Sequence, residues 1–196
     1  MKKQKFSLIS EYKKSFSYIR ESKKFIYSII LIFFIFALVG FFVPLPVEIK
    51  TQLFNYLKEL LGKISGLSTF EMIKFIFLNN IQSSFFGLFL GFFFGIFSVL
   101  VSIVNGFILG FIASLTVSNG GVLSLWRIFP HGIFELPAVF ISLGLGMKFG
   151  TFFFAKKPWK TFKEYFWNSI RVFLTIVLPL LIIAAIIEGV LIGVLR

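Results

Sequence analysis

One histidine and one glutamate lie four residues apart in the segment Pro130-His131-Gly132-Ile133-Phe134-Glu135-Leu136-Pro137. His131 is the only histidine of the chain, and Glu135 is one of just eight acidic residues. An ionisable group at membrane depth costs roughly 2.5–3.5 kcal/mol on insertion scales, so such groups usually have a partner or a use. An imidazole beside a carboxylate could relay a proton, bind a polar substrate or act as a base.

Further polar residues in the apolar part of the chain could join this pair. Arg127 precedes the first proline of the segment by three residues, and Glu188 lies in the last apolar run. Lys148 also falls within apolar sequence, although its long stem could carry the ammonium to the membrane surface. Amides act as both donors and acceptors of hydrogen bonds. We therefore consider a buried network of Asn80, Asn105, Arg127, His131, Glu135 and Glu188.

A purely structural role would suffice for the histidine and the glutamate. Residues at i and i+4 share one face of a helix, and they could also meet across a break at Gly132. A hydrogen bond between them would then satisfy both groups and fix the bend of the chain.

Three functions compete with this structural interpretation. An intramembrane hydrolase would need Glu135 as base, but zinc usually takes three protein ligands. With one histidine and no cysteine or aspartate, only glutamates remain, so no catalytic residue, metal or cofactor is predicted. A small transporter or channel for protons, ions or lipids could use His131 and Glu135, because such sites form at broken helices. Finally, the bend could fix the shape of a non-enzymatic scaffold.

Composition places these residues in a membrane. The chain has 196 residues, is 58% hydrophobic and 14% charged, and has a mean hydropathy of +0.96. From Phe75 to Trp126, 52 residues include no charged residue and no histidine, whereas a crossing helix needs about 20. The net charge of +12 clusters beside apolar runs, which indicates contact with membrane lipids and not with nucleic acid.

The hydropathy pattern predicts an all-α, polytopic membrane bundle. Residues 47–66 show the periodicity of an amphipathic surface helix, and Ser68 with Glu71 forms a capping box for the next helix. Residues 122–132 are too short to cross and predict a re-entrant or interfacial half-helix broken at Pro-His-Gly, with Pro137 in the first turn of the following span. The five predicted spans are residues 25–43, 76–97, 99–118, 135–155 and 170–194.

Charge asymmetry predicts the orientation of the chain. Residues 1–24 form a basic cytoplasmic segment, either an amphipathic helix on the inner leaflet or a solvated tail. Five crossings put this segment and the basic loop 156–163 on the same side, as the positive-inside rule requires. We expect a single transmembrane domain, 25–196, in the plasma membrane, with a cytoplasmic N-terminus and the 47–66 helix outside.

Glycines four residues apart recur in four of the five spans. Such spacing makes a groove in which a second helix can approach closely. Because the first span has no such pair, we expect the others to form the core and the first to be peripheral. The grooves are also compatible with the association of two copies. The glycines are Gly87, Gly91, Gly95, Gly106, Gly110, Gly146, Gly150, Gly189 and Gly193.

The motifs together resemble the stage II sporulation protein M family over roughly residues 70–195. Besides Pro-His-Gly, the resemblance rests on Asn79-Asn80, Asn105-Gly106 and Glu135-Leu136-Pro137-Ala138, followed by Gly144 and Gly146. The resemblance implies a multi-spanning membrane protein with no assigned enzymatic activity. In sporulating bacteria the family member works as the membrane anchor of cell-wall-degrading partners. Its implied signature positions are Asn80, Asn105, His131, Gly132, Glu135 and Pro137.

We therefore expect a non-enzymatic membrane scaffold or anchor that engages partner proteins of the membrane or cell envelope. The outer helix at residues 47–66 is its expected contact surface. A small transporter or channel is the alternative.

Overall fold

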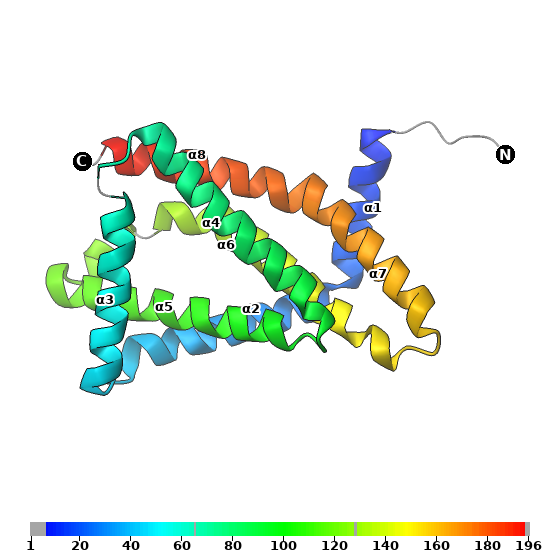
Figure 1. Cartoon of the computed structure of the whole chain (residues 1–196), viewed down its shortest axis with the longest axis horizontal. Helices are drawn as coiled ribbons and strands as arrows, with labels where there is room; N and C mark the ends of the chain where they lie inside the picture. The colour runs from blue at the N-terminus through cyan, green and yellow to red at the C-terminus, as the bar shows by residue number, and fades with distance from the viewer. Residues whose placement is uncertain (1–6, 65, 128, 195–196) are drawn as a thin grey trace.

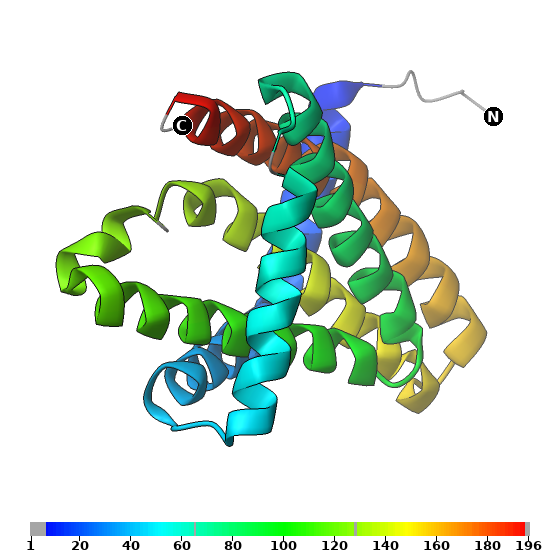
Figure 2. The same cartoon turned by 60° about the vertical axis from the view of Figure 1, so that its left-hand side comes forward.

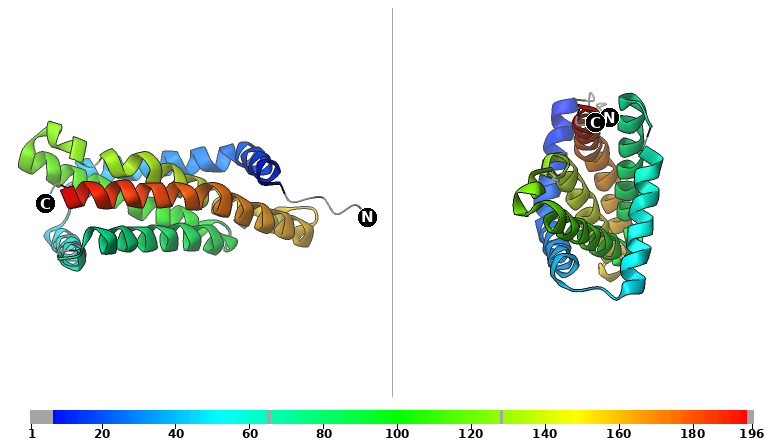
Figure 3. Two further views of the ribbon diagram at one scale, coloured as in Figure 1. Left: turned by 90° about the horizontal axis from the view of Figure 1, so that it is seen from above. Right: turned by 90° about the vertical axis from the view of Figure 1, so that its left-hand side faces the viewer.

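The computed structural model describes residues 7–64, 66–127 and 129–194, which are almost entirely helical and contain no strand. The side chains of residues 60, 61, 64, 126, 127, 129–131, 193 and 194 are outside this description. The long helices run lengthwise along an elongated bundle, with α4 and α8 inclined to α2 and α5 (Figures 1 and 3). The elements are α1 (Leu8–Glu21), α2 (Lys23–Phe42), α3 (Val47–Ile64), α4 (Thr69–Phe89), η1 (Leu90–Phe92), α5 (Ile96–Gly120), η2 (Val122–Arg127), α6 (Phe129–Phe149), η3 (Gly150–Phe154), α7 (Pro158–Val172), η4 (Phe173–Val177) and α8 (Leu178–Val194).

Five helical segments of the described chain are long and apolar enough to cross a membrane, which confirms the predicted fold class. They are Lys23–Phe42, Thr69–Phe92, Ile96–Gly120, Gly132–Phe154 and Pro158–Ile192. The capping box at the start of α4 is also confirmed. The Ser68 amide donates to the Glu71 carboxylate at 2.9 Å, and the Glu71 amide donates to the Ser68 hydroxyl at 3.4 Å.

Several boundaries differ from the prediction. The second span runs from Thr69 to Phe92, not from residue 76 to residue 97. The backbone of Pro130, His131 and Gly132 forms the beginning of α6, which continues without a break to Phe149. Pro137 therefore lies inside the helix and not in its first turn, and it cannot donate to the carbonyl of Ile133. The preceding η2 is a short 3-10 helix. The last span also begins earlier than predicted, because α7 continues through the single π-turn η4 into α8.

The first span is the least buried of the five candidate spans, as expected of a peripheral helix, but α2 also packs closely along α5. A Cβ atom at Gly106 or Gly110 would collide with the backbone of α2 at Phe33 or Ala37. One at Gly40 of α2 would likewise collide with α5. The small residues that let α2 approach lie mainly on α5, so the absence of a glycine pair in α2 did not indicate this contact.

The turn between α4 and α5 holds these helices against α6 at one end. A Cβ at Gly91 would meet the backbone of Gly146, and one at Gly150 would meet that of Gly95. Gly95 has a φ of +74°, a left-handed conformation that few other residues adopt readily. From this turn α4 and α5 diverge, and α6 lies behind them (Figure 1).

Two helices lie outside this arrangement. α3 runs across one end of the bundle, transverse to the long helices (Figures 1 and 2). α1 packs on α7 and the π-turn at the opposite end, where the Ser15 and Thr175 hydroxyls are 2.9 Å apart. The Arg171 guanidinium donates to the Glu11 carboxylate at 2.6 Å.

Candidate functional site

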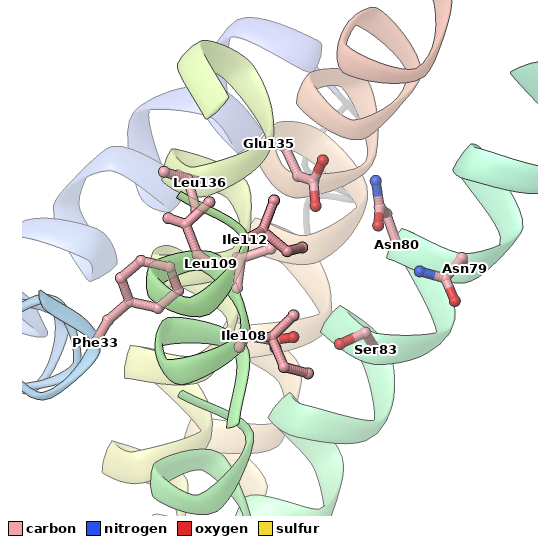
Figure 4. Close-up of a pocket in the computed structure, with 11 residues that line it drawn as sticks. Phe33, Asn79, Asn80, Ser83, Ile108, Leu109, Ile112, Glu135 and Leu136 are labelled. Atoms are coloured by element: carbon pink, nitrogen blue, oxygen red, sulfur yellow. The ribbon is translucent and has the colours of Figure 1, made fainter. Parts of the chain in front are cut away.

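A polar cavity of about 170 Å³ lies where α4 and α5 diverge over α6. Asn79, Asn80 and Ser83 of α4, Asn105 of α5 and Glu135 of α6 supply its polar groups. Figure 4 shows the Asn80 amide and the Glu135 carboxylate directed toward one another from the two helices. The apolar walls are formed by Phe33, Ile108, Leu109, Ile112, Leu136 and Val139.

The helix geometry places this cavity near the middle of the bundle. Asn79 is the central residue of α4, ten residues from either end, which corresponds to about 15 Å of helix on each side. The hydrocarbon core of a bilayer is about 30 Å thick. The amides therefore lie near the level at which lipid offers no hydrogen-bonding group.

The amides around the cavity have unused hydrogen-bonding capacity. Asn80 is only 8% exposed. Within the described part of the chain, no hydrogen bond engages the side-chain amide of Asn79, Asn80 or Asn105. A buried amide without a partner is costly, so groups that face a cavity of this size are suited to bind water or a polar ligand.

The structure thus brings Asn80, Asn105 and Glu135 of the considered network to one cavity. Glu188 lies in α8 and is not among the residues that line it. Gly132 is in the first turn of α6, and the side chains of Arg127 and His131 are among those the structure leaves undescribed. Asn79 and Ser83 are additional members. Their i and i+4 spacing on α4 was a signal that could have identified them.

The glycines singled out in the sequence lie at other positions, where helices approach each other. Besides those already placed, a Cβ at Gly87 would meet the side chain of Leu143, and one at Gly189 would meet that of Ile73. Gly193 falls among the residues whose surroundings are not described. Among the described residues, no group of three or more His, Cys, Asp or Glu side chains could hold a metal ion.

A second polar cluster, which the sequence did not predict, surrounds Lys148 at the opposite end of α6. Its side chain is not extended to the surface, because Lys148 is only 7% exposed. The ammonium donates to the Ser22 hydroxyl at 3.0 Å and lies 3.9 Å from the ring centroid of Tyr18 and 5.0 Å from that of Tyr165. A cation over desolvated aromatic rings is strongly held.

Unlike the groups that line the polar cavity, the groups around Lys148 are packed against one another. Ser22 itself donates to the Tyr18 carbonyl at 2.6 Å. Tyr18 is 4% exposed, and burial raises the pKa of its phenol well above the ordinary value, so it stays neutral. The cluster therefore joins α1 to α6 and α7 by contacts that leave little room for a ligand.

Comparison with known proteins identifies a family. The family model described as Stage II sporulation protein M matches residues 29–191, from within α2 to within α8. The matched region includes every residue that lines the polar cavity, but it excludes Tyr18 and Ser22. No curated protein and no solved structure matches the chain.

Proposed function

Because the chain belongs to the stage II sporulation protein M family, we propose that it is a non-enzymatic membrane scaffold that binds proteins of the membrane or cell envelope. Its five apolar helices and its family make it a multi-pass membrane protein. Such a scaffold holds its partner by a surface of its own.

The observation that carries this proposal is the exposed apolar surface of α3. Val47 is 75% exposed, Phe54 53% and Tyr56 48%, although α3 is outside the five candidate spans. Charged residues share this helix, including the ion pair between Lys63 and Glu59 at 2.8 Å, which lies on the same side as Tyr56 and away from Val47 and Phe54. An exposed apolar surface beside polar residues is typical of a protein-binding or membrane-binding site.

The orientation that we propose puts α3 where envelope proteins can reach it. Basic residues concentrate in α1 and around Pro158, at the end of the bundle opposite α3. The positive-inside rule assigns that basic end to the cytoplasm. The chain has no cysteine, so Asn55→Cys and Lys157→Cys can each be labelled alone. In intact cells, a membrane-impermeant maleimide should label Asn55→Cys but not Lys157→Cys, and the reverse would refute the orientation.

Photo-crosslinking in native membranes tests the scaffold. A photoreactive amino acid at Phe54 should link repeatedly to the same envelope protein, identified by mass spectrometry. Leu123 in η2, which is 88% exposed at the same end of the bundle, is the control position. Equal capture at both positions, or none at Phe54, contradicts the proposal. A Phe54→Ser variant should lose the crosslinked partner in co-purification while retaining the thermal stability of the parent.

The polar cavity favours transport as a second candidate function. Amides and a carboxylate near the middle of the membrane could pass a proton or a small polar solute between them. This function predicts pH-dependent flux through liposomes that Glu135→Gln abolishes in a folded protein. The scaffold predicts no flux at any pH. Dye-loaded liposomes that contain the purified protein distinguish the two functions directly.

A further inference from the structure

The outward face of α4 carries two amides among aromatic residues. Phe75, Asn79, Gln82 and Phe86 follow one another at intervals of four, three and four residues, so they form one stripe along the helix. Asn79, Gln82 and Phe86 are exposed, and Phe75 is partly exposed. These exposures indicate that no described helix covers this face of α4, which lies in front of α6 in Figure 1.

The two amides lie at a depth where lipid cannot satisfy them. Asn79 is the central residue of α4 and Gln82 is one turn further along. Within the described chain, no hydrogen bond engages either side chain. Water in the cavity can reach Asn79, but Gln82 is not among the lining residues. Amides in this position promote the association of membrane helices, because a second helix offers the hydrogen bonds that hydrocarbon lacks.

We propose that this stripe is a self-association surface, on which α4 of a second copy packs in parallel and pairs its Asn79 and Gln82 amides with those of the first copy. An amide is both donor and acceptor, so it is complementary to itself. A two-fold axis along the membrane normal brings each residue opposite its own counterpart, at the same depth.

The residue spacing and the charge of the stripe are compatible with α4 of a second copy. Intervals of four and three residues are those of a left-handed helix pair, in which a polar seam residue fixes the register and the number of helices. The stretch from Phe75 to Phe86 contains no charged residue, so a second copy can pack on the stripe without bringing like charges together. The inference is independent of any partner bound at α3.

Single cysteines in the otherwise cysteine-free chain can test the contact in purified protein reconstituted in liposomes. Phe86→Cys lies in the stripe, and Leu100→Cys lies on α5 at a similar distance from the α4–α5 turn. The native side chains are comparably exposed, at 54% and 48%. On mild oxidation, Phe86→Cys should form a disulfide-linked dimer at least fivefold more than Leu100→Cys. Equal dimer formation would mean random collision and would overturn the proposal.

Removing the amides should remove the dimer without unfolding the protein. In the Phe86→Cys background, Asn79→Leu with Gln82→Leu should reduce cross-linking at least tenfold, whereas Asn79→Gln, which keeps an amide, should preserve it. Helix content and thermal stability should stay equal to those of the parent or rise, because both positions are exposed. Unchanged cross-linking in the double variant would refute the role of the amides.

Energy transfer between donor-labelled and acceptor-labelled copies supplies a measurement that needs no disulfide. Transfer should increase with the protein-to-lipid ratio and saturate, and the double leucine variant should show only the background of random proximity. A protein that stays monomeric at every ratio overturns the proposal. So does a Phe86→Cys protein that links only to a different protein in native membranes, since the stripe would then belong to that partner.

Discussion

Toward its two ends, α6 contributes to two polar clusters, which differ in how many partners the protein offers to their polar groups. Lys148, at one end, has a hydroxyl acceptor and two aromatic rings around its ammonium. Glu135, thirteen residues earlier, faces a cavity whose asparagine amides make no hydrogen bond within the described chain. Both clusters are costly in a membrane. Only the second retains capacity for water, a solute or another side chain.

This difference separates an anchoring cluster from a binding cluster. Closing the Lys148 cluster requires α1, so α1 should be firmly attached wherever the ammonium is buried. The cavity amides, which make no hydrogen bond to the described protein, add no comparable stability. Functional sites often contain groups that do not stabilise the fold. Substitutions around Lys148 should therefore mainly lower stability, whereas substitutions around the polar cavity should mainly change binding or activity.

The largest effect on stability is expected at Tyr18. Tyr18→Ala removes a buried ring and leaves the Lys148 ammonium without its nearest aromatic neighbour, so unfolding should become easier by about 3–5 kcal/mol. Tyr18→Phe keeps the ring, and the Tyr18 hydroxyl has no hydrogen-bond partner in the described structure. This control should cost less than about 1 kcal/mol. Thermal unfolding in detergent compares the two, and equal losses would contradict a closed cluster that depends on the ring.

The sequence predicted the spans well because hydrophobicity and length alone determine which helices can cross a membrane. It also identified Asn80, Asn105 and Glu135, since polar residues in apolar sequence are conspicuous. Their common cavity could not be derived, because it depends on how α4 and α5 diverge over α6.

The Lys148 cluster could not be predicted for a different reason. Lys148 and Ser22 are 126 residues apart, and a lysine in a span more often extends its stem to the surface. Likewise, the packing of α2 depended mainly on small residues in α5, its partner, together with the single Gly40 of α2. Contacts of this kind are properties of pairs of helices, which periodicity within one helix does not show.

A smaller effect on stability is expected at the polar cavity. Asn80→Leu replaces an amide that has no partner in the described chain by an apolar side chain of similar size. The free energy of unfolding should change by less than about 1 kcal/mol and could increase, because no protein hydrogen bond is lost. Ser142→Ala is a useful contrast, since its hydroxyl donates to the Ser84 carbonyl at 2.6 Å, and it should cost about 0.5–1.5 kcal/mol. Denaturation in detergent measures both, and a loss above about 2 kcal/mol in Asn80→Leu would indicate a structural role instead.

The smallest effect concerns the exposed side of the α1 contact and depends on pH. The neighbouring Lys14 ammonium and Arg171 guanidinium hold the pKa of Glu11 below its usual value. A carboxylate whose pKa is lowered in the folded state stabilises that state above its unfolded pKa, and the stabilisation is lost as the pH falls through the folded pKa. We expect the attachment of α1 to weaken only below about pH 4.3, the ordinary value for glutamate.

Hydrogen exchange of the α1 amides, corrected for the intrinsic rate at each pH, measures this attachment. Protection should fall slightly between neutral pH and the acidic range in the parent protein. In Glu11→Gln, which keeps the shape of the side chain without its charge, protection should be lower at neutral pH and should change less on acidification. Because the ion pair is partly exposed, high salt should reduce the difference between the two proteins. If protection instead fell by the same amount in both proteins, the pH dependence would have to come from another group, and the closed cluster around Lys148 would be holding α1 without help from Glu11.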